Sequence, residues 1–108
     1  MTVADPDWVE AWEGLLPTIV QVYEELYQLH VEKSGTYGDD EDRLANFTRL
    51  ADRLEMDWEA IPVIRMGEKQ IRVENMIADG LADDVKEYKD IASLALCAEA
   101  LRRRRRGA

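Results

Sequence analysis

The stretch PDWVEAWEGLLPTIVQVYEELYQLH, residues 6–30, decides the fold class. Its apolar positions advance in alternating steps of four and three residues, which is the spacing of one face of an α-helix. That face runs through Trp8, Trp12, Leu15, Ile19, Val22, Leu26 and Leu29. A helix that starts at Pro6 is therefore predicted. Pro17 is expected to kink or split it near Gly14, and residues 34–38 are expected to form the loop that follows.

Three further helices are predicted beyond this stretch. Residues 42–54 carry a narrow apolar face. The next helix runs from a candidate N-cap, Asp57, to a candidate C-cap, Gly80. The last starts at Asp83 or Asp84 and continues into a run of arginines, where cations suit the helix dipole. Because no stretch alternates as a strand does, we expect an all-α fold, a four-helix bundle.

Charge is distributed unevenly along the chain. The 108 residues include 23 acidic and 14 basic side chains, a net charge of −9, and residues 102–106 are five consecutive arginines. Residues 1–101 alone carry 9 basic against 23 acidic side chains, or −14. We therefore expect a single helical domain at 1–101 and a basic C-terminal tail at 102–108. So acidic a domain repels phosphate backbones, which leaves the arginine tail as the expected place for any nucleic-acid contact.

Several function classes are excluded by what the sequence lacks. No apolar run is long enough to span a membrane, and residues 1–8 lack the basic charge of a signal or transit peptide, so a cytoplasmic location is expected. One cysteine, Cys97, permits no internal disulfide, and one histidine, His30, permits no cluster of histidine metal ligands. Phosphate-loop, dinucleotide-binding and serine-hydrolase motifs are absent.

The apolar stripes become polar at positions where a core is expected. The last stripe reads Glu87, Asp90, Leu94, Cys97 and Leu101, so it begins with two carboxylates three residues apart. Other polar interruptions of the stripes, or polar residues beside them, are Lys33, Asn46, Glu68, Arg72 and Asn75. Buried charges are costly unless they are paired or bound to a metal. We therefore expect these side chains to converge on one polar cavity.

Such a cavity would suit a phosphate ligand and a hard cation. Glu87 and Asp90 can share Mg²⁺ at this spacing, while Lys33 and Arg72 meet phosphate oxygens. The same residues permit a plainer interpretation. Glu68 and Arg72 then form an ordinary ion pair along one helix, and the two carboxylates lie in a solvated first turn. Spacing alone leaves both interpretations open.

Four short blocks of sequence resemble a family signature. They are KSGTYGD at 33–39, NFTR at 46–49, EKQIRVEN at 68–75 and EYKDIA at 87–92. In this order they resemble small phage proteins of the nucleotide modification associated domain group. That group is similar to the MazG-like all-α nucleoside triphosphate pyrophosphohydrolases. The resemblance covers about residues 30–101 and implies a MazG-like helical bundle that works in the cytoplasm of a phage host.

The resemblance assigns the catalytic and metal-binding roles to three acids. Glu87 and Asp90 fit the ExxD pattern, whose carboxylates hold Mg²⁺ over a nucleoside triphosphate, and Glu68 would join them. The EExxE helix of the MazG-like enzymes has no good counterpart, because Lys69 and Arg72 stand where that pattern requires acids. This departure weakens the implied hydrolytic activity more than it weakens the implied fold.

The remaining candidates would bind substrate. Lys33 and Arg72 would stabilise phosphate charge. Asn46 and Asn75 would orient the substrate or the metal ligands. Tyr37 would stack on a base or ribose, or would plug one end of the bundle. These two roles for Tyr37 remain alternatives.

Two functions of different classes follow. The leading hypothesis is a phage-type nucleotide-binding protein. Its further expected activity is Mg²⁺-assisted attack of water on a phosphoanhydride, which gives a monophosphate and pyrophosphate. The alternative is a non-enzymatic acidic helical protein that binds and modulates a host or defence protein. A homo-oligomer, a dimer in its simplest form, is also expected, with Trp8 and Trp12 contributing to the face between subunits.

Overall fold

The chain is helical wherever the computed structural model describes secondary structure. Residues 6–37, 42 and 44–107 are described, although the side chains of residues 6–12 and 34–37 are not. The elements are α1 (Pro6–Tyr37), α2 (Ala45–Arg53), α3 (Ala60–Ala78), a 3₁₀ turn η1 (Ala82–Asp84) and α4 (Tyr88–Arg105). The predicted all-α class is confirmed. Within the described ranges, no helix is long and apolar enough to cross a membrane.

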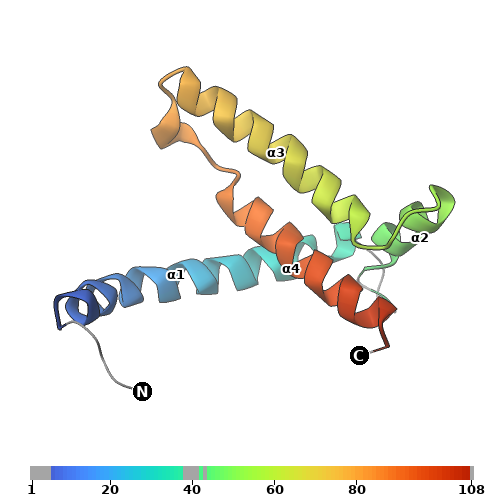
Figure 1. Cartoon of the computed structure of the whole chain (residues 1–108), viewed down its shortest axis with the longest axis horizontal. Helices are drawn as coiled ribbons and strands as arrows, with labels where there is room; N and C mark the ends of the chain where they lie inside the picture. Colours follow the sequence, from blue (N-terminus) through green and yellow to red (C-terminus); the bar gives the residue numbers. More distant parts are fainter. Residues whose placement is uncertain (1–5, 38–41, 43, 108) are drawn as a thin grey trace.

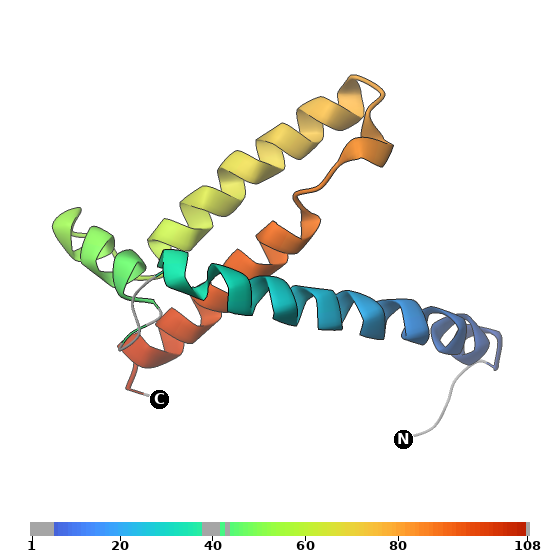
Figure 2. The same cartoon turned by 180° about the vertical axis from the view of Figure 1, so that it is seen from behind.

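Two helices form a hairpin, and the other two pack around it (Figure 1 and Figure 2). α3 and α4 run in opposite directions and are joined through η1. α1 crosses α4, and α2 lies beside the start of α3, while the N-terminal half of α1 projects away from the other helices. The arrangement is open. Its radius of gyration is 17.3 Å, against roughly 13 Å for a compact domain of this length.

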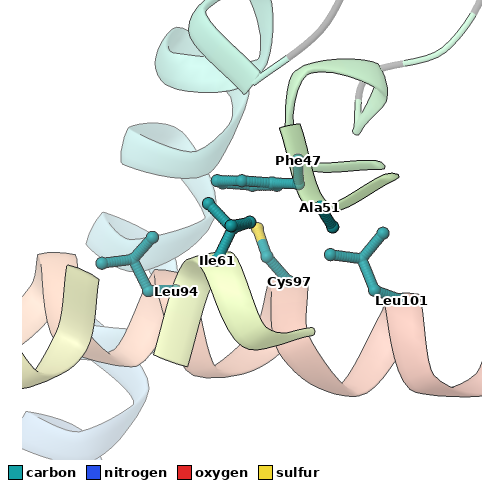
Figure 3. Close-up of a cluster of buried hydrophobic side chains, with 6 residues drawn as sticks. All are labelled: Phe47, Ala51, Ile61, Leu94, Cys97 and Leu101. Carbon is teal, nitrogen blue, oxygen red and sulfur yellow. The ribbon is translucent and has the colours of Figure 1, made fainter. Parts of the chain in front are cut away.

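One small apolar cluster holds α2, α3 and α4 together. Its buried members are Phe47 and Ala51 from α2, Ile61 from α3, and Leu94, Cys97 and Leu101 from α4 (Figure 3). Burial of a large apolar side chain contributes about 1.5–3 kcal/mol, so these contacts fix α2 against the hairpin. The stripe predicted for the end of the last helix is confirmed. Leu54, the last residue of the range predicted for the second helix, follows the end of α2 and is 52% exposed.

α3 begins and ends through recognisable local signals. Its N-cap residue is Glu59 and not the predicted Asp57, and Pro62 lies in the first turn, where proline removes no helical hydrogen bond. At the other end Gly80 has a φ of 78°. The Gly80 N–H donates to the Ile77 carbonyl and the Leu81 N–H to the Met76 carbonyl, as in a Schellman motif. The helix end predicted near Gly80 is therefore confirmed, although the C-cap residue is Asp79 and Gly80 is the left-handed residue that follows it.

The arginine run forms the end of α4. Residues 102–105 are helical, so no structural boundary coincides with the expected division at residue 101. Arg104 donates to both carboxylate oxygens of Asp42 at 3.0 Å, and Arg105 donates to Glu59 at 2.6 Å. Arg102 and Arg103 both pair with Glu99 on their own helix. The pairs of Arg104 with Asp42 and of Arg105 with Glu59 connect the end of α4 to the segment before α2 and to the start of α3.

α1 is longer and less interrupted than the sequence predicts. Pro17 lies inside α1 without splitting it, and the helix continues to Tyr37, through most of the predicted loop. A glycine inside a helix costs roughly 0.5–1 kcal/mol relative to alanine, so Gly35 is tolerated once the preceding turns have formed. Gly38 lies outside the described residues, as does the side chain of Tyr37.

α4 begins later than the sequence predicts. Asp83 and Asp84 belong to η1, and Val85 then adopts an extended conformation (φ −66°, ψ 128°) that ends the turn. Glu87 therefore occupies the N-cap position of α4, and Asp90 lies in the first turn. Negative charge is favourable at that end of a helix because of the exposed backbone N–H groups.

Candidate functional site

Charged side chains from three helices meet around Asp90. Lys33, in the last turns of α1, donates from Nζ to Asp90 Oδ1 at 2.7 Å. Lys69 of α3 lies 3.5 Å from the other oxygen, Oδ2. One carboxylate thus contacts a lysine with each of its oxygens. These two contacts connect α1 and α3 to the start of α4.

A second carboxylate lies one helical turn earlier. Glu87 Oε1 is 4.0 Å from Arg72 Nη1 of α3. The Glu87 side chain is only 14% exposed, whereas the Arg72 side chain is 60% exposed. Lys69 and Arg72 lie three residues apart on α3, as Glu87 and Asp90 do at the start of α4, so two cations face two carboxylates across the hairpin. We call Lys33, Lys69, Arg72, Glu87 and Asp90 the charged cluster.

The ionisation of Asp90 follows from its neighbours. Partial burial would raise the pKa of this carboxyl. The hydrogen bond from Lys33 and the charges of Lys33 and Lys69 outweigh burial, so the pKa is lowered from its usual value. Asp90 is therefore a carboxylate at neutral pH, and its two oxygens act only as acceptors.

The charged cluster is open enough to exchange partners. The side chains of Lys33, Lys69 and Asp90 are 38%, 25% and 23% exposed. Ion pairs with this degree of solvent access are typically worth 0–1 kcal/mol, so a stronger anion can compete for the lysines. Within the charged cluster, as the described residues form it, three cations face two carboxylates. The negative charge and acceptor oxygens of a phosphate group could pair with these cations.

A groove between α2 and α3 leads to the charged cluster. It has a volume of about 540 Å³ and shares Lys69 and Arg72 with the cluster. Its other lining residues are Leu50, Leu54, Ile61, Ile64, Arg65 and Glu68. Arg65 also lies over the ring of Phe47, 5.6 Å from its centroid. Apolar walls that end at cations are the usual composition of a site for a small charged molecule.

Four of the residues singled out in the sequence meet in the charged cluster: Lys33, Arg72, Glu87 and Asp90. Glu68 is exposed and lines the groove. Asn46 and Asn75 are both exposed, on α2 and α3. The described side chains do not include Tyr37.

Lys69 is the member of the charged cluster that sequence reasoning missed. In the sequence, Lys69 stands out only because it occupies a position where the EExxE pattern requires an acid. The signal that could have identified it is its spacing, because Lys69 precedes Arg72 by three residues and so lies on the same side of the helix. A pair of cations at this spacing matches the pair of carboxylates on the facing helix.

The acids of the described residues do not form a complete metal cage. No three of their histidine, cysteine, aspartate or glutamate side chains gather closely enough to hold a metal ion. Glu68 therefore does not stand with Glu87 and Asp90. Mg²⁺ is commonly held by one or two carboxylates together with substrate phosphates and water, so Glu87 and Asp90 match that smaller donor set.

Comparison of the chain with protein-family models, with curated proteins and with solved structures returned no match. The resemblance to the nucleotide modification associated domain group therefore rests on the sequence blocks alone.

Proposed function

We propose that the chain binds the phosphate groups of a nucleotide at the charged cluster. The observation behind this proposal is the convergence of Lys33, Lys69 and Arg72 on the carboxylates at the start of α4. In this proposal the lysines exchange Asp90 for phosphate oxygens, and Arg72 uses its planar guanidinium to bind two oxygens at once. The MazG-like family and the phage origin belong to the same proposal, supported by the four sequence blocks.

The base and sugar of the nucleotide would lie in the groove between α2 and α3. Ile61 and Ile64 give this groove apolar surface for a base, and Arg65 supplies a flat cation that can stack on it. The groove meets the charged cluster at Lys69 and Arg72, so one molecule could occupy both. Asn46, Asn75 and Tyr37 remain candidates for contacts to the base or sugar.

Hydrolysis to a monophosphate and pyrophosphate is the second part of the proposal. Glu87 and Asp90 would hold Mg²⁺, which would polarise the phosphoanhydride when bound. For this to happen, Lys33 and Lys69 must release Asp90, and the incoming phosphate gives them an alternative partner. Glu68, at the groove, would be available to accept a proton from the attacking water. Each residue named in these steps belongs to the charged cluster or to the lining of the groove.

Binding is tested by titrating the full chain with each deoxynucleoside triphosphate, with and without Mg²⁺. Thermal unfolding and calorimetry report binding, and pyrophosphate release reports hydrolysis. Lys69→Gln should weaken binding about tenfold or more, because a charged hydrogen bond to phosphate contributes about 1.5–3 kcal/mol. Lys86→Gln, an exposed lysine outside the cluster, is the matched control and should bind as the wild type does. No binding by any nucleotide would contradict the proposal and favour a non-enzymatic interaction protein.

Asp90→Asn separates phosphate binding from metal binding. The substitution frees Lys33 and Lys69 from their carboxylate, so binding without Mg²⁺ should tighten. It also removes a metal ligand, so Mg²⁺ should no longer enhance binding and pyrophosphate release should stop. An unchanged Mg²⁺ enhancement in this variant would contradict a metal role for Asp90 and leave only phosphate binding.

A further inference from the structure

α1 presents an apolar stripe to solvent. Leu16, Val20, Tyr23 and Tyr27 follow one another in steps of four, three and four residues, so they lie on one side of the helix. Their exposed fractions are 47%, 51%, 66% and 66%. These four residues are called the α1 stripe below. Two tyrosines in a row of aliphatic side chains are typical of a binding surface, where tyrosine is enriched.

The part of α1 that projects from the hairpin is apolar on a second side. Leu15 and Val22, on the face that further along contacts α4, are 53% and 43% exposed. Only Leu26 of this helix is buried among its described side chains. Both views show the N-terminal half of α1 extending past the other helices (Figure 1 and Figure 2). Helices in proteins acquire most of their stability from the packing of an apolar face, and the described part of this helix leaves much of that face exposed.

A matching concave surface lies beside the α1 stripe. A groove of about 430 Å³ runs along the junction of α1 and α4. Its lining residues are Tyr23, Leu26, Tyr27, His30, Ala92, Ala95 and Leu96. The small side chains of Ala92 and Ala95 leave space on α4 for the groove, and the hydrogen bond between His30 Nδ1 and Ser93 Oγ (2.9 Å) lies beside it. The groove and the stripe share Tyr23 and Tyr27, so a protruding ridge and a groove adjoin on one surface of the chain.

The surface area of the single chain exceeds that of a compact monomer. Its accessible surface is 8060 Å², whereas a compact monomeric protein of 12.4 kDa has roughly 6,100 Å². The excess is about 2,000 Å² per chain. Obligate homodimers bury about 1,000–2,500 Å² on each subunit. The excess is therefore of the size that one permanent subunit interface removes.

We propose that this surface binds a second copy of the chain, with the α1 stripe of each subunit packed into the α1–α4 groove of the other. A two-fold dimer uses the same patch on both subunits, so the patch must be complementary to itself, as an adjoining ridge and groove can be. Residues near the axis meet their own copies, and a charge there would meet a like charge. The α1 stripe contains no charged residue. Glu25 and Glu32 lie on another side of α1, and Glu24 lies at the edge of the stripe, four residues after Val20.

The mass of the full chain in solution tests the dimer. Sedimentation equilibrium should give twice 12.4 kDa. Tyr27→Arg introduces a charge at the centre of the interface and should raise the dimer dissociation constant about 30-fold or more. Gln21→Arg introduces the same charge on the polar side of α1 and should leave the mass unchanged. A concentration of about 100 µM is well above the dissociation constant expected of an obligate dimer, so a wild type that remains monomeric there would overturn the proposal. A dimer that Tyr27→Arg does not weaken would overturn it as well.

Cross-linking keeps the proposal testable if Tyr27→Arg fails to fold. A single cysteine at each position of the α1 stripe in turn, in an otherwise wild-type chain, places a thiol near its own copy wherever that position lies close to the two-fold axis. Mild oxidation should then link the two chains for at least one of the four variants. Gln21→Cys is the control, and the native Cys97 is buried, so neither should cross-link. No cross-link from any position of the stripe would overturn the proposal.

The dimer and nucleotide binding can fail separately. The α1 stripe shares no residue with the charged cluster, so a protein that dimerises without binding nucleotides would contradict only the proposed function.

Discussion

At the scale of single residues, Asp90 connects three helices. It lies at the start of α4 and contacts Lys33 of α1 and Lys69 of α3. Its lowered pKa means that the folded protein binds its proton less readily than the unfolded chain does. The contribution of Asp90 to stability is therefore fully present above the pKa of the unfolded chain, and it disappears as the pH falls through the lower pKa of the folded state.

Asp90→Asn should destabilise the protein at pH 7 by about 1 kcal/mol, the loss expected for two partly exposed ion pairs. The difference from wild type should shrink as the pH falls below 4, where the wild-type carboxyl takes up its proton. Urea unfolding at a series of pH values measures both effects. Asp83→Asn, in the exposed turn η1, should change the unfolding free energy by less than about 0.5 kcal/mol. A destabilisation by Asp90→Asn that is equal at pH 7 and pH 2.5 would show that its charge is not the cause.

At the scale of elements, the two described glycines of the α3 region differ in backbone conformation. Gly80 follows the end of α3 with a φ of 78°, a conformation that side chains disfavour, whereas Gly67 lies inside the helix. An added Cβ would meet nothing within 4 Å at either position. Backbone conformation alone therefore separates the two substitutions.

Gly80→Ala should destabilise the protein by about 1 kcal/mol through the left-handed conformation. Gly67→Ala should stabilise it by about 0.5–1 kcal/mol, because alanine restricts the unfolded chain and favours the helix. Chemical unfolding of the two variants beside the wild type measures both changes. If Gly80→Ala did not destabilise the protein, the left-handed conformation of Gly80 would not constrain the end of α3.

The helices themselves could be predicted from sequence because their apolar periodicity is a local property. The stripe ending in Leu94, Cys97 and Leu101 is the clearest case, since all three are buried. The boundaries of the helices were harder to predict from sequence. Gly35 does not end α1, and Val85 delays α4, because helix ends depend on contacts that the local sequence does not show. The interrupted stripes identified four of the five members of the charged cluster, together with three residues that lie outside it, and the spacing of Lys69 from Arg72 gains meaning only beside the facing carboxylates.

At the scale of the whole molecule, the open shape is the feature that sequence could not predict. Periodicity identifies which side of α1 is apolar, but it does not identify the partner that covers it. In the structure α4 covers only part of that side, around Leu26, and the α1 stripe remains exposed. If the proposed dimer forms, the stability of the fold depends on protein concentration, and the charged clusters of the two subunits are held in one assembly.

The proposal that the charged cluster binds nucleotide phosphate is tested most directly by a crystal structure of the full chain with Mg²⁺ and a non-hydrolysable deoxynucleoside triphosphate. We expect the phosphates to lie between Lys33, Lys69 and Arg72, with the base in the groove between α2 and α3. We also expect Asp90 to have exchanged its lysines for the metal. A nucleotide bound elsewhere, with the Lys33–Asp90 contact intact, would contradict the proposal.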